Sequence, residues 1–271
     1  ASTYGYGFDY NAGTLTVAQY DLTATIANVS ATYGDAVSAG SVSLNKIGSD
    51  AVGVTASIVS PVYSTASKLK AGSYSQITGA TANLTGDDAA NYTLSATTSA
   101  NSVTVDKYDL TATIANVSAT YGDAVSAGSV SLNKIGSDAV GVTASIVSPV
   151  YSTASKLKAG SYSQITGATA NLTGDDAANY TLSATTRANS VTVAQKAITV
   201  TNIAAAEKVY NGNTAATIDV SSASFTDLVA GDTVTVSSAT GTFSDKNVGT
   251  GKIVTLTETY AGTDRDNYTI T

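Results

Sequence analysis

The chain contains one 86-residue sequence twice in tandem. Residues 20–105 recur as residues 108–193, at an offset of 88, and the only difference between the copies is Ser99 against Arg187. Tandem copying multiplies a small folding unit and does not enlarge a single core. The duplication therefore predicts an array of similar modules, and it favours length, spacing or multiplicity as the purpose of the chain.

A divergent third unit follows the two copies. Its residues 262–270 (GTDRDNYTI) align with residues 86–94 (GDDAANYTL), and residues 230–236 align with residues 48–54. These segments occur in the same order in each unit. We therefore predict a third module that stops before its own closing strand.

The first residues of the chain match the end of a copy. Residues 11–19 (NAGTLTVAQ) are comparable with residues 101–107 (NSVTVDK). This match predicts the closing strand of an upstream module, followed by a first, a second and a third repeat. The corresponding ranges are residues 1–19, 20–107, 108–195 and 196–271.

Apolar residues alternate with Thr and Ser along much of the chain. Leu22, Ala24 and Ile26 alternate with threonines, and the same period of two extends from Val52 to Ile58. This period is typical of strands with one buried face, and Gly-Asp and Ala-Gly-Ser clusters between the runs suit tight turns. The sequence therefore predicts an all-β chain in which each repeat is a small β-sandwich or β-grasp-like unit.

The junctions between repeats are short and alike. Val105 and Leu110 are five residues apart, as are Val193 and Ile198, and no Pro- or Gly-rich linker intervenes. An odd separation turns the side chains from one core to the next. Connections this short predict a rod-like array. Because the copies are nearly identical, a strand of one copy also fits the other, so strand exchange is an expected hazard of folding.

Composition argues against several classes of protein. The chain has no Cys, His, Met or Trp, and its formal net charge is -7 with 13 scattered Lys and Arg. Without Cys it forms neither disulfides nor thiolate metal sites, and without His it lacks the commonest general base. The acidic balance argues against a nucleic-acid partner, and no apolar run of about 18 residues is present for membrane insertion. We expect a soluble chain that is not an enzyme.

Two short motifs have the spacing of catalytic or phosphate-binding elements. Residues 67–70 contain Ser-x-x-Lys, but no partner motif accompanies them. Residues 249–252 (GTGK) resemble part of a phosphate-binding loop, but Ile253 stands where Ser or Thr would hold magnesium. Both segments are therefore predicted to be loops or turns.

Paired aspartates give the most plausible ion site. Asp87 and Asp88 follow a glycine on a turn, and Asp175 and Asp176 repeat them in the second copy. Such carboxylates supply the hard oxygen ligands that calcium prefers. The alternative interpretation is that they cap the turn before the strand that starts near Asn91. Calcium is thus the one cofactor that the sequence suggests, and the simpler expectation is no cofactor and no metal.

Tyrosine is the main aromatic residue of the chain, with 16 Tyr against three Phe and no Trp. An exposed ring can stack on the face of a sugar, and Tyr63 and Tyr151, beside a Pro-Val pair in each copy, are the candidate glycan contacts. Tyr33, Tyr74 and Tyr92 are instead predicted to fill the core, because few other large side chains are present to do so.

The repeats resemble the MBG and YDG repeat types. Residues 33–36 (YGDA) and their copy, with AGSY, ANYTL and VTV downstream, are similar to the MBG type. The third repeat is similar to the YDG type, although Asn211 stands where that family usually has Asp. The motifs that carry this second resemblance are KVYNGNT, GDTV, FSDKNVGTGK and DNYT, at residues 208–214, 231–234, 243–252 and 266–269.

This resemblance implies a place in large secreted bacterial adhesins of the filamentous-haemagglutinin-like kind, exported by two-partner secretion and including biofilm-matrix adhesins. The expected function is a structural stalk that extends a distal binding region in cell–cell, surface or biofilm-matrix adhesion. The alternative is that the repeats themselves bind glycan or exopolysaccharide weakly and multivalently. The implied location is extracellular, secreted or attached to the cell surface. The expected partners are neighbouring repeats and polysaccharides or surface glycans of host or bacterium.

Overall fold

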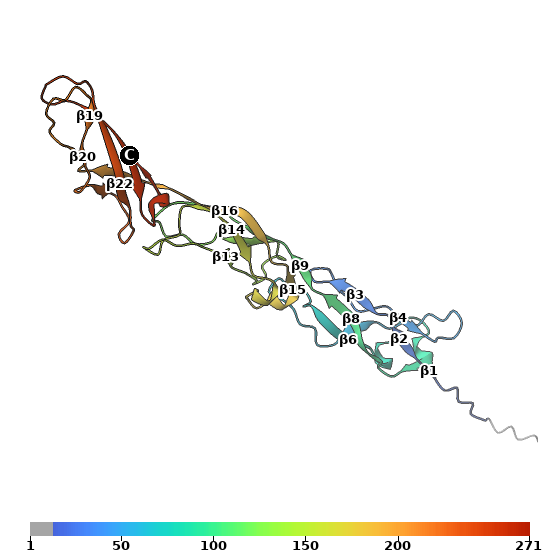
Figure 1. Ribbon diagram of the computed structural model, residues 1–271. Coiled ribbons are helices and arrows are strands. Elements are labelled where there is room, and N and C mark those ends of the chain that lie inside the picture. Colours follow the sequence, from blue (N-terminus) through green and yellow to red (C-terminus); the bar gives the residue numbers. More distant parts are fainter. Residues whose placement is uncertain (1–12) are drawn as a thin grey trace, which may run out of the picture. The chain divides into compact units, whose positions relative to one another are not determined.

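A computed structural model describes residues 13–271 of the chain (Figure 1). Every regular element in this range is a β-strand or a three-residue 3₁₀ helix, and the described residues contain no α-helix. The predicted all-β class is therefore confirmed. No helix in this part of the chain is long and apolar enough to cross a membrane.

The chain forms two compact units. Unit 1 comprises the residues up to 108 together with residues 135–138 and 178–180. Unit 2 comprises the remaining residues, 109–134, 139–177 and 181–271. Unit 1 thus contains the first repeat and a small part of the second, whereas unit 2 contains most of the second repeat and the whole of the third.

The first repeat contains the strands β1 (Tyr20–Leu22), β2 (Ala24–Ile26), β3 (Val29–Thr32), β4 (Val42–Leu44), β5 (Ala56–Ile58), β6 (Gly72–Thr78), β7 (Tyr92–Leu94) and β8 (Thr98–Asp106), with the 3₁₀ helices η1 (Thr81–Asn83) and η2 (Ala89–Asn91). A four-stranded sheet has the order β3-β8-β6-β5, in which β3 and β8 are parallel and the other pairs antiparallel. β1 pairs with β7 in parallel, and β2 pairs with β4 in antiparallel orientation.

The second repeat contains β9 (Tyr108–Leu110), β10 (Ala112–Ile114), β11 (Val117–Thr120), β12 (Val130–Leu132), β13 (Ala144–Ile146), β14 (Gly160–Thr166), β15 (Tyr180–Leu182) and β16 (Thr186–Ala194), with η3 (Thr169–Asn171) and η4 (Ala177–Asn179). Its sheets repeat those of the first repeat strand for strand, with the orders β11-β16-β14-β13, β10-β12 and β15-β9. Nearly identical sequence therefore gives the same strand pairing in both copies.

The third repeat contains β17 (Lys196–Thr201), β18 (Ala204–Ala205), β19 (Ala215–Ala216), β20 (Ile218–Asp219), β21 (Ser224–Thr226), β22 (Thr235–Phe243), β23 (Val254–Ala261) and β24 (Tyr268–Ile270), with η5 (Arg265–Asn267). Its sheets have the orders β21-β17-β24, β18-β20 and β19-β22-β23. Among the described residues β23 pairs only with β22, whereas β6 and β14 have a strand on each side. β23 is therefore an edge strand.

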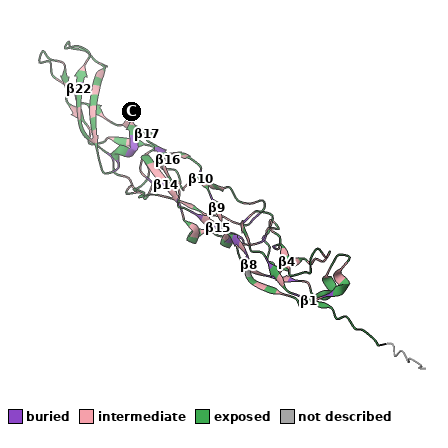
Figure 2. Cartoon of the chain, turned by 90° about the vertical axis from the view of Figure 1, so that its right-hand side faces the viewer, coloured by how far each residue is buried: buried purple, intermediate pink, exposed green. Residues whose placement is uncertain are grey.

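Burial follows the predicted alternation in part (Figure 2). Leu22 and Ile26 are buried, and the threonines between them are exposed. The single strand predicted from Val52 to Ile58 is shorter in the structure. β5 begins only at Ala56, and Gly53 forms a separate bridge with Thr85.

A buried glutamine joins two sheets of the first repeat. β6 carries a bulge between Tyr74 and Gln76, and Gln76 is fully buried. The Gln76 side-chain oxygen accepts the Gly40 N–H at 2.5 Å, and its amide donates to the Ala27 carbonyl at 3.1 Å. Only glycine fits at position 40, because a Cβ there would lie 2.0 Å from the Ala27 oxygen. Gln164 makes the same two bonds in the second repeat.

The connections between repeats are nearly continuous strands. β8 ends at Asp106 and β9 begins at Tyr108, while β16 ends at Ala194 and β17 begins at Lys196. A single residue thus lies between the strands at each junction. A closing strand is predicted at residues 1–19, but the described part of this segment contains no strand. Residues 1–12 lie outside the described range, and residues 13–19 form no strand.

Candidate functional site

A carboxylate that binds two tyrosines connects the first and second repeats within unit 1. Asp138 is fully buried and accepts hydrogen bonds from the hydroxyl groups of Tyr33 and Tyr180 at the same oxygen, Oδ2. The Tyr180 bond measures 2.6 Å. The two rings meet edge to face with centroids 5.3 Å apart. Tyr33 belongs to the first repeat and Asp138 and Tyr180 to the second, so this contact joins consecutive repeats.

Backbone groups of the first repeat add to this joint. The Ala66 N–H donates to Asp138 Oδ1 at 3.0 Å, and the Ala71 N–H donates to Asn179 Oδ1 at 2.9 Å. Gly34 follows Tyr33 with a φ of +104°, and a Cβ at this position would lie 3.1 Å from Ile135 Cδ1. The glycine thus permits both the turn and the close approach of the second repeat.

Unit 2 contains the same joint between the second and third repeats. Tyr121 and Tyr268 both donate to Asp232 Oδ2, at 2.5 and 2.6 Å, and their rings meet edge to face at 5.2 Å. The Ala154 N–H donates to Asp232 Oδ1 at 3.2 Å. Asn267 accepts an N–H as Asn179 does, here at 3.0 Å from Ala159. The third repeat differs widely in sequence from the other two, yet it preserves each of these contacts.

A second carboxylate strengthens the joint in unit 2. Asp264 is fully buried and accepts hydrogen bonds from the N–H and the hydroxyl group of Thr153, and from the N–H of Thr233. Burial opposes ionisation of Asp264, but these hydrogen bonds outweigh it and hold the pKa of the carboxyl group below its ordinary value. The carboxylate is therefore ionised in this contact at neutral pH.

The contact in unit 1 shifts the pKa of Asp138 and that of Tyr180, and the contact in unit 2 shifts the pKa of Tyr121. Burial would raise the pKa of Asp138, but hydrogen bonds from the two tyrosines, from Ser64 and from the Ala66 N–H outweigh it and hold the pKa below its ordinary value. Burial, and after it the bond to the carboxylate, raises the pKa of Tyr180 and raises that of Tyr121 to about 12. Tyr180 and Tyr121 are therefore neutral phenols at neutral pH, and each donates a hydrogen bond to a carboxylate.

The first repeat carries the acceptor half of the same joint at Asp50. Tyr92 donates to Asp50 Oδ2 at 2.5 Å, as Tyr180 donates to Asp138. Among the described residues no second tyrosine hydroxyl reaches Asp50, which is partly exposed. Ile47 is exposed, whereas its counterpart Ile135 is half-buried. The same sequence thus lies in two environments. In the second copy it is covered by the first repeat, and in the first copy it is more exposed.

The predicted ion-site residues lie at turns. Asp88 accepts the Ala51 N–H at 2.8 Å, and Asp176 accepts the Ala139 N–H at 3.0 Å, so each carboxylate binds a backbone group 37 residues earlier in the chain. Asp87 and Asp175 are exposed. No group of three or more acidic, His or Cys residues that could hold a metal ion occurs within residues 13–271. Calcium binding at these positions stays a prediction.

The tyrosines occupy the two predicted kinds of environment. Tyr63 and Tyr151 are each 56 % exposed, at one end of a narrow hairpin in which Tyr63 bridges Leu69. Tyr33 and Tyr92 are buried, while Tyr74 is half-buried and donates its hydroxyl group to the Lys70 carbonyl at 2.9 Å. The exposed pair is therefore accessible to a ligand, and the other three are structural.

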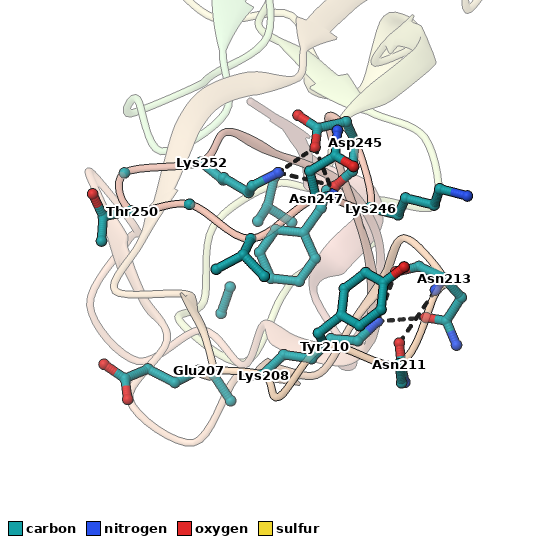
Figure 3. Close-up of a pocket in the computed structure, with 17 residues that line it drawn as sticks. Glu207, Lys208, Tyr210, Asn211, Asn213, Asp245, Lys246, Asn247, Thr250 and Lys252 are labelled. Carbon is teal, nitrogen blue, oxygen red and sulfur yellow. Dashed lines mark hydrogen bonds and ion pairs between the residues drawn. The ribbon is translucent and has the colours of Figure 1, made fainter.

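The two motifs judged to be loops lie in loops. Ser67 is at the tip of the hairpin, with a φ of +57°. Residues 249–252 help to line an open groove of about 500 Å³ in the third repeat, between the segments 205–213 and 243–254 (Figure 3). Lys252 pairs there with Asp245, and this hydrogen bond lowers the pKa of the exposed carboxyl group.

Sequence reasoning found the tyrosines of the joint but missed the acceptors. Asp50, Asp138 and Asp232 occupy matching positions in the three repeats, as the alignment of residues 48–54 with 230–236 shows. An Asp at the same position of all three repeats was the sequence signal that could have identified the acceptor. The repeat that supplies the tyrosine to each Asp was not predictable, because each copy contains both the tyrosine donor and the Asp acceptor.

The YDG domain family matches residues 194–271, which cover the third repeat. This part of the chain is therefore a YDG-type module, as its motifs predict. Searches among curated proteins and among solved structures gave no match. The resemblance of the first two repeats to the MBG type stays a prediction.

Proposed function

We propose that the chain is a segment of a structural stalk in a large bacterial surface or secreted adhesin, located outside the cell, where it extends a distal binding region. The observation that carries this proposal is the joint. The same tyrosine–carboxylate–tyrosine contact joins consecutive repeats in unit 1 and in unit 2, although the third repeat differs in sequence. Asp138 and Asp232 thus serve contacts between repeats.

The joints support a rod-like array of small β modules at fixed pitch. Each junction combines a one-residue connection with hydrogen bonds from a tyrosine and two backbone N–H groups of the preceding repeat. A flexible linker would allow neighbouring modules to rotate freely, whereas these bonds restrain them. A spacer with restrained joints projects its far end over a defined distance.

Small-angle X-ray scattering tests the spacer function. A variant that lacks residues 108–195 brings the first repeat directly before the third and lets Tyr33 take the place of Tyr121 at Asp232. We expect the maximum dimension to fall by one repeat, roughly 30–40 Å, with an unchanged cross-section. A maximum dimension that barely changes would contradict the proposal.

The alternative function is weak multivalent glycan binding, favoured by one observation. Tyr63 and Tyr151 present exposed rings at equivalent positions of the two copies. A pull-down with immobilised polysaccharide compares the unaltered chain with the Tyr63→Ala/Tyr151→Ala double variant. Binding that needs these rings and grows with the number of copies supports the alternative, and equal retention of both chains at background level supports a spacer.

A further inference from the structure

In each of the first two repeats, a strand near the start runs parallel to the strand at the end. β3 pairs with β8 from Val29 opposite Val103 to Thr32 opposite Asp106 (Figure 1). β11 pairs with β16 in the same orientation and register. Because the two strands of a pair run in the same direction, the chain enters at one end of the pair and leaves at the other. A pull on the two ends of a repeat therefore draws the strands lengthwise in opposite directions.

The direction of a pull decides how the hydrogen bonds between two strands break. These bonds run across the strands, so a lengthwise pull is shared by all of them and they must break together. A pull that separates the strands from one end breaks the bonds one after another, and each break needs little force. Tension along the chain acts on β3 with β8, and on β11 with β16, in the first of these two ways.

The same strands are protected from water and extended by one bond. Val103 and Val105 of β8 are buried, and so are their counterparts in β16. The buried side chains limit the access of water, and a hydrogen bond is stronger where water is excluded. The Tyr33 N–H donates to the Asp106 carbonyl at 2.8 Å, which continues the pairing beyond the end of β3.

A second parallel pair lies at the start of the first and third repeats. β1 pairs in parallel with β7, and β17 pairs in parallel with β24. A glutamine just before the first strand adds a bond to each pair. Gln19 donates to the Ala90 carbonyl at 2.8 Å, and Gln195 donates to the Asp266 carbonyl at 2.9 Å. The third repeat differs in sequence from the first, yet it has the same arrangement.

The residue that follows β3 also belongs to the joint. Tyr33 donates its hydroxyl group to Asp138 of the second repeat, and Tyr121, which follows β11, donates to Asp232 of the third. The second repeat is therefore attached to β8 through the chain and to β3 through this tyrosine. If β8 is to slide along β3 toward the second repeat, the contact between Tyr33 and Asp138 must break as well.

We propose that the parallel strands and the joint tyrosine of each of the first two repeats act together to resist tension along the chain. This function rests on the proposed stalk and deepens it, because a stalk transmits the pull between a surface and its distal binding region. Tension is divided between the bonds of the strand pair and the tyrosine–carboxylate contact. Forced unfolding depends on the unfolding rate and not on the equilibrium stability, so a small β unit can withstand such a pull.

Optical tweezers that hold the full chain at two introduced cysteines test the direction of the pull. The chain has no Cys of its own, so the handles attach only where they are placed. Ala18→Cys/Lys107→Cys, at two exposed residues, pulls the first repeat lengthwise. Asn28→Cys/Ala100→Cys, also at exposed residues, pulls β3 and β8 apart from one end. At the same force we expect the first variant to unfold at least about tenfold more slowly. Equal unfolding rates would overturn the proposal.

Asp138→Ala tests the part of the joint tyrosine, and it changes no residue of the first repeat. With handles at Ala18→Cys and Asp175→Cys the force crosses the joint, and the first repeat releases more residues than the second, so the step length identifies it. We expect Asp138→Ala to speed the unfolding of the first repeat at least about tenfold.

The position of the second handle provides the control. With the handle at Lys107→Cys the force leaves the first repeat before it reaches the joint, so Asp138→Ala should have a smaller effect there. No effect of Asp138→Ala, or an equal effect with both handles, would overturn the proposal. These failures would leave the spacer function untouched, because the scattering test measures the length of the chain without tension.

Discussion

At the scale of single residues, one carboxylate oxygen shared by two phenol groups determines the joint. Asp50 and Asp138 have identical neighbours in sequence, but only Asp138 is fully buried and receives a tyrosine from another repeat. A charged acceptor strengthens both hydrogen bonds. The same acceptor would be costly to lose, because its removal takes the carboxylate acceptor from two buried hydroxyl groups.

Replacement of this acceptor gives the first prediction. We expect Asp138→Ala to lower the free energy of unfolding by about 3 kcal/mol, since buried donors lose their partner. Asp50→Ala is the matched control and should cost much less, because one partly exposed contact is lost. Urea denaturation followed by tyrosine fluorescence measures both. Equal losses for the two variants would contradict the account.

The pKa shifts predict how stability depends on pH. The folded-state pKa of Asp138 lies below its ordinary value, so its contribution is present above about pH 4 and is lost as the pH falls further. The pKa of Tyr121 is raised to about 12, so its contribution is present below about pH 10 and is lost as the pH rises toward that value. Thermal melts across the pH range should show both declines. A Tyr121→Phe variant should show a smaller decline on the alkaline side.

At the scale of strands, alternation predicted the buried faces but not the pairing. Leu22 and Ile26 lie on one buried face as expected, yet β1 and β2 pair with different strands. The Asn45 side chain accepts the Thr23 N–H at 2.6 Å, where the chain changes partner. Such a switch depends on a side chain 22 residues away, so a local period of two does not reveal it. The local sequence does not reveal the bulge that turns Gln76 inward either, because the bulge depends on pairing with the distant strand β8.

Gln164 gives a prediction at this scale. Its side chain bonds Gly128 and Ala115 across two sheets and is fully buried. We expect Gln164→Leu to destabilise the second repeat by about 2 kcal/mol, because two part-buried backbone groups lose their hydrogen-bond partners. Ser161→Ala, an exposed change on the same strand, is the control and should be nearly neutral. Hydrogen exchange of the β10 and β14 amides reports the effect locally. Unchanged protection in Gln164→Leu would show that the bonds do not stabilise the contact between the sheets.

At the scale of the whole molecule, recurrence of the joint is the main finding. Composition and motifs predicted repeats, an all-β class and a YDG-type third repeat. They did not predict which groups join the repeats. Both copies contain the tyrosine at the position of Tyr33 and the aspartate at the position of Asp50. A contact within one copy and a contact between two copies therefore fit the sequence equally well. The structure distinguishes them: Tyr33 reaches Asp138, which is 105 residues away.

A double-mutant cycle on Tyr33 and Asp138 tests this claim most directly. Unfolding free energies are measured for Tyr33→Phe, for Asp138→Ala, for the double variant and for the unaltered chain. We predict a coupling energy of at least about 1 kcal/mol, because the two side chains share one hydrogen bond. The cycle of Tyr33→Phe with Asp50→Ala is the control and should be additive. Additivity of Tyr33→Phe and Asp138→Ala would contradict the joint between the first and second repeats.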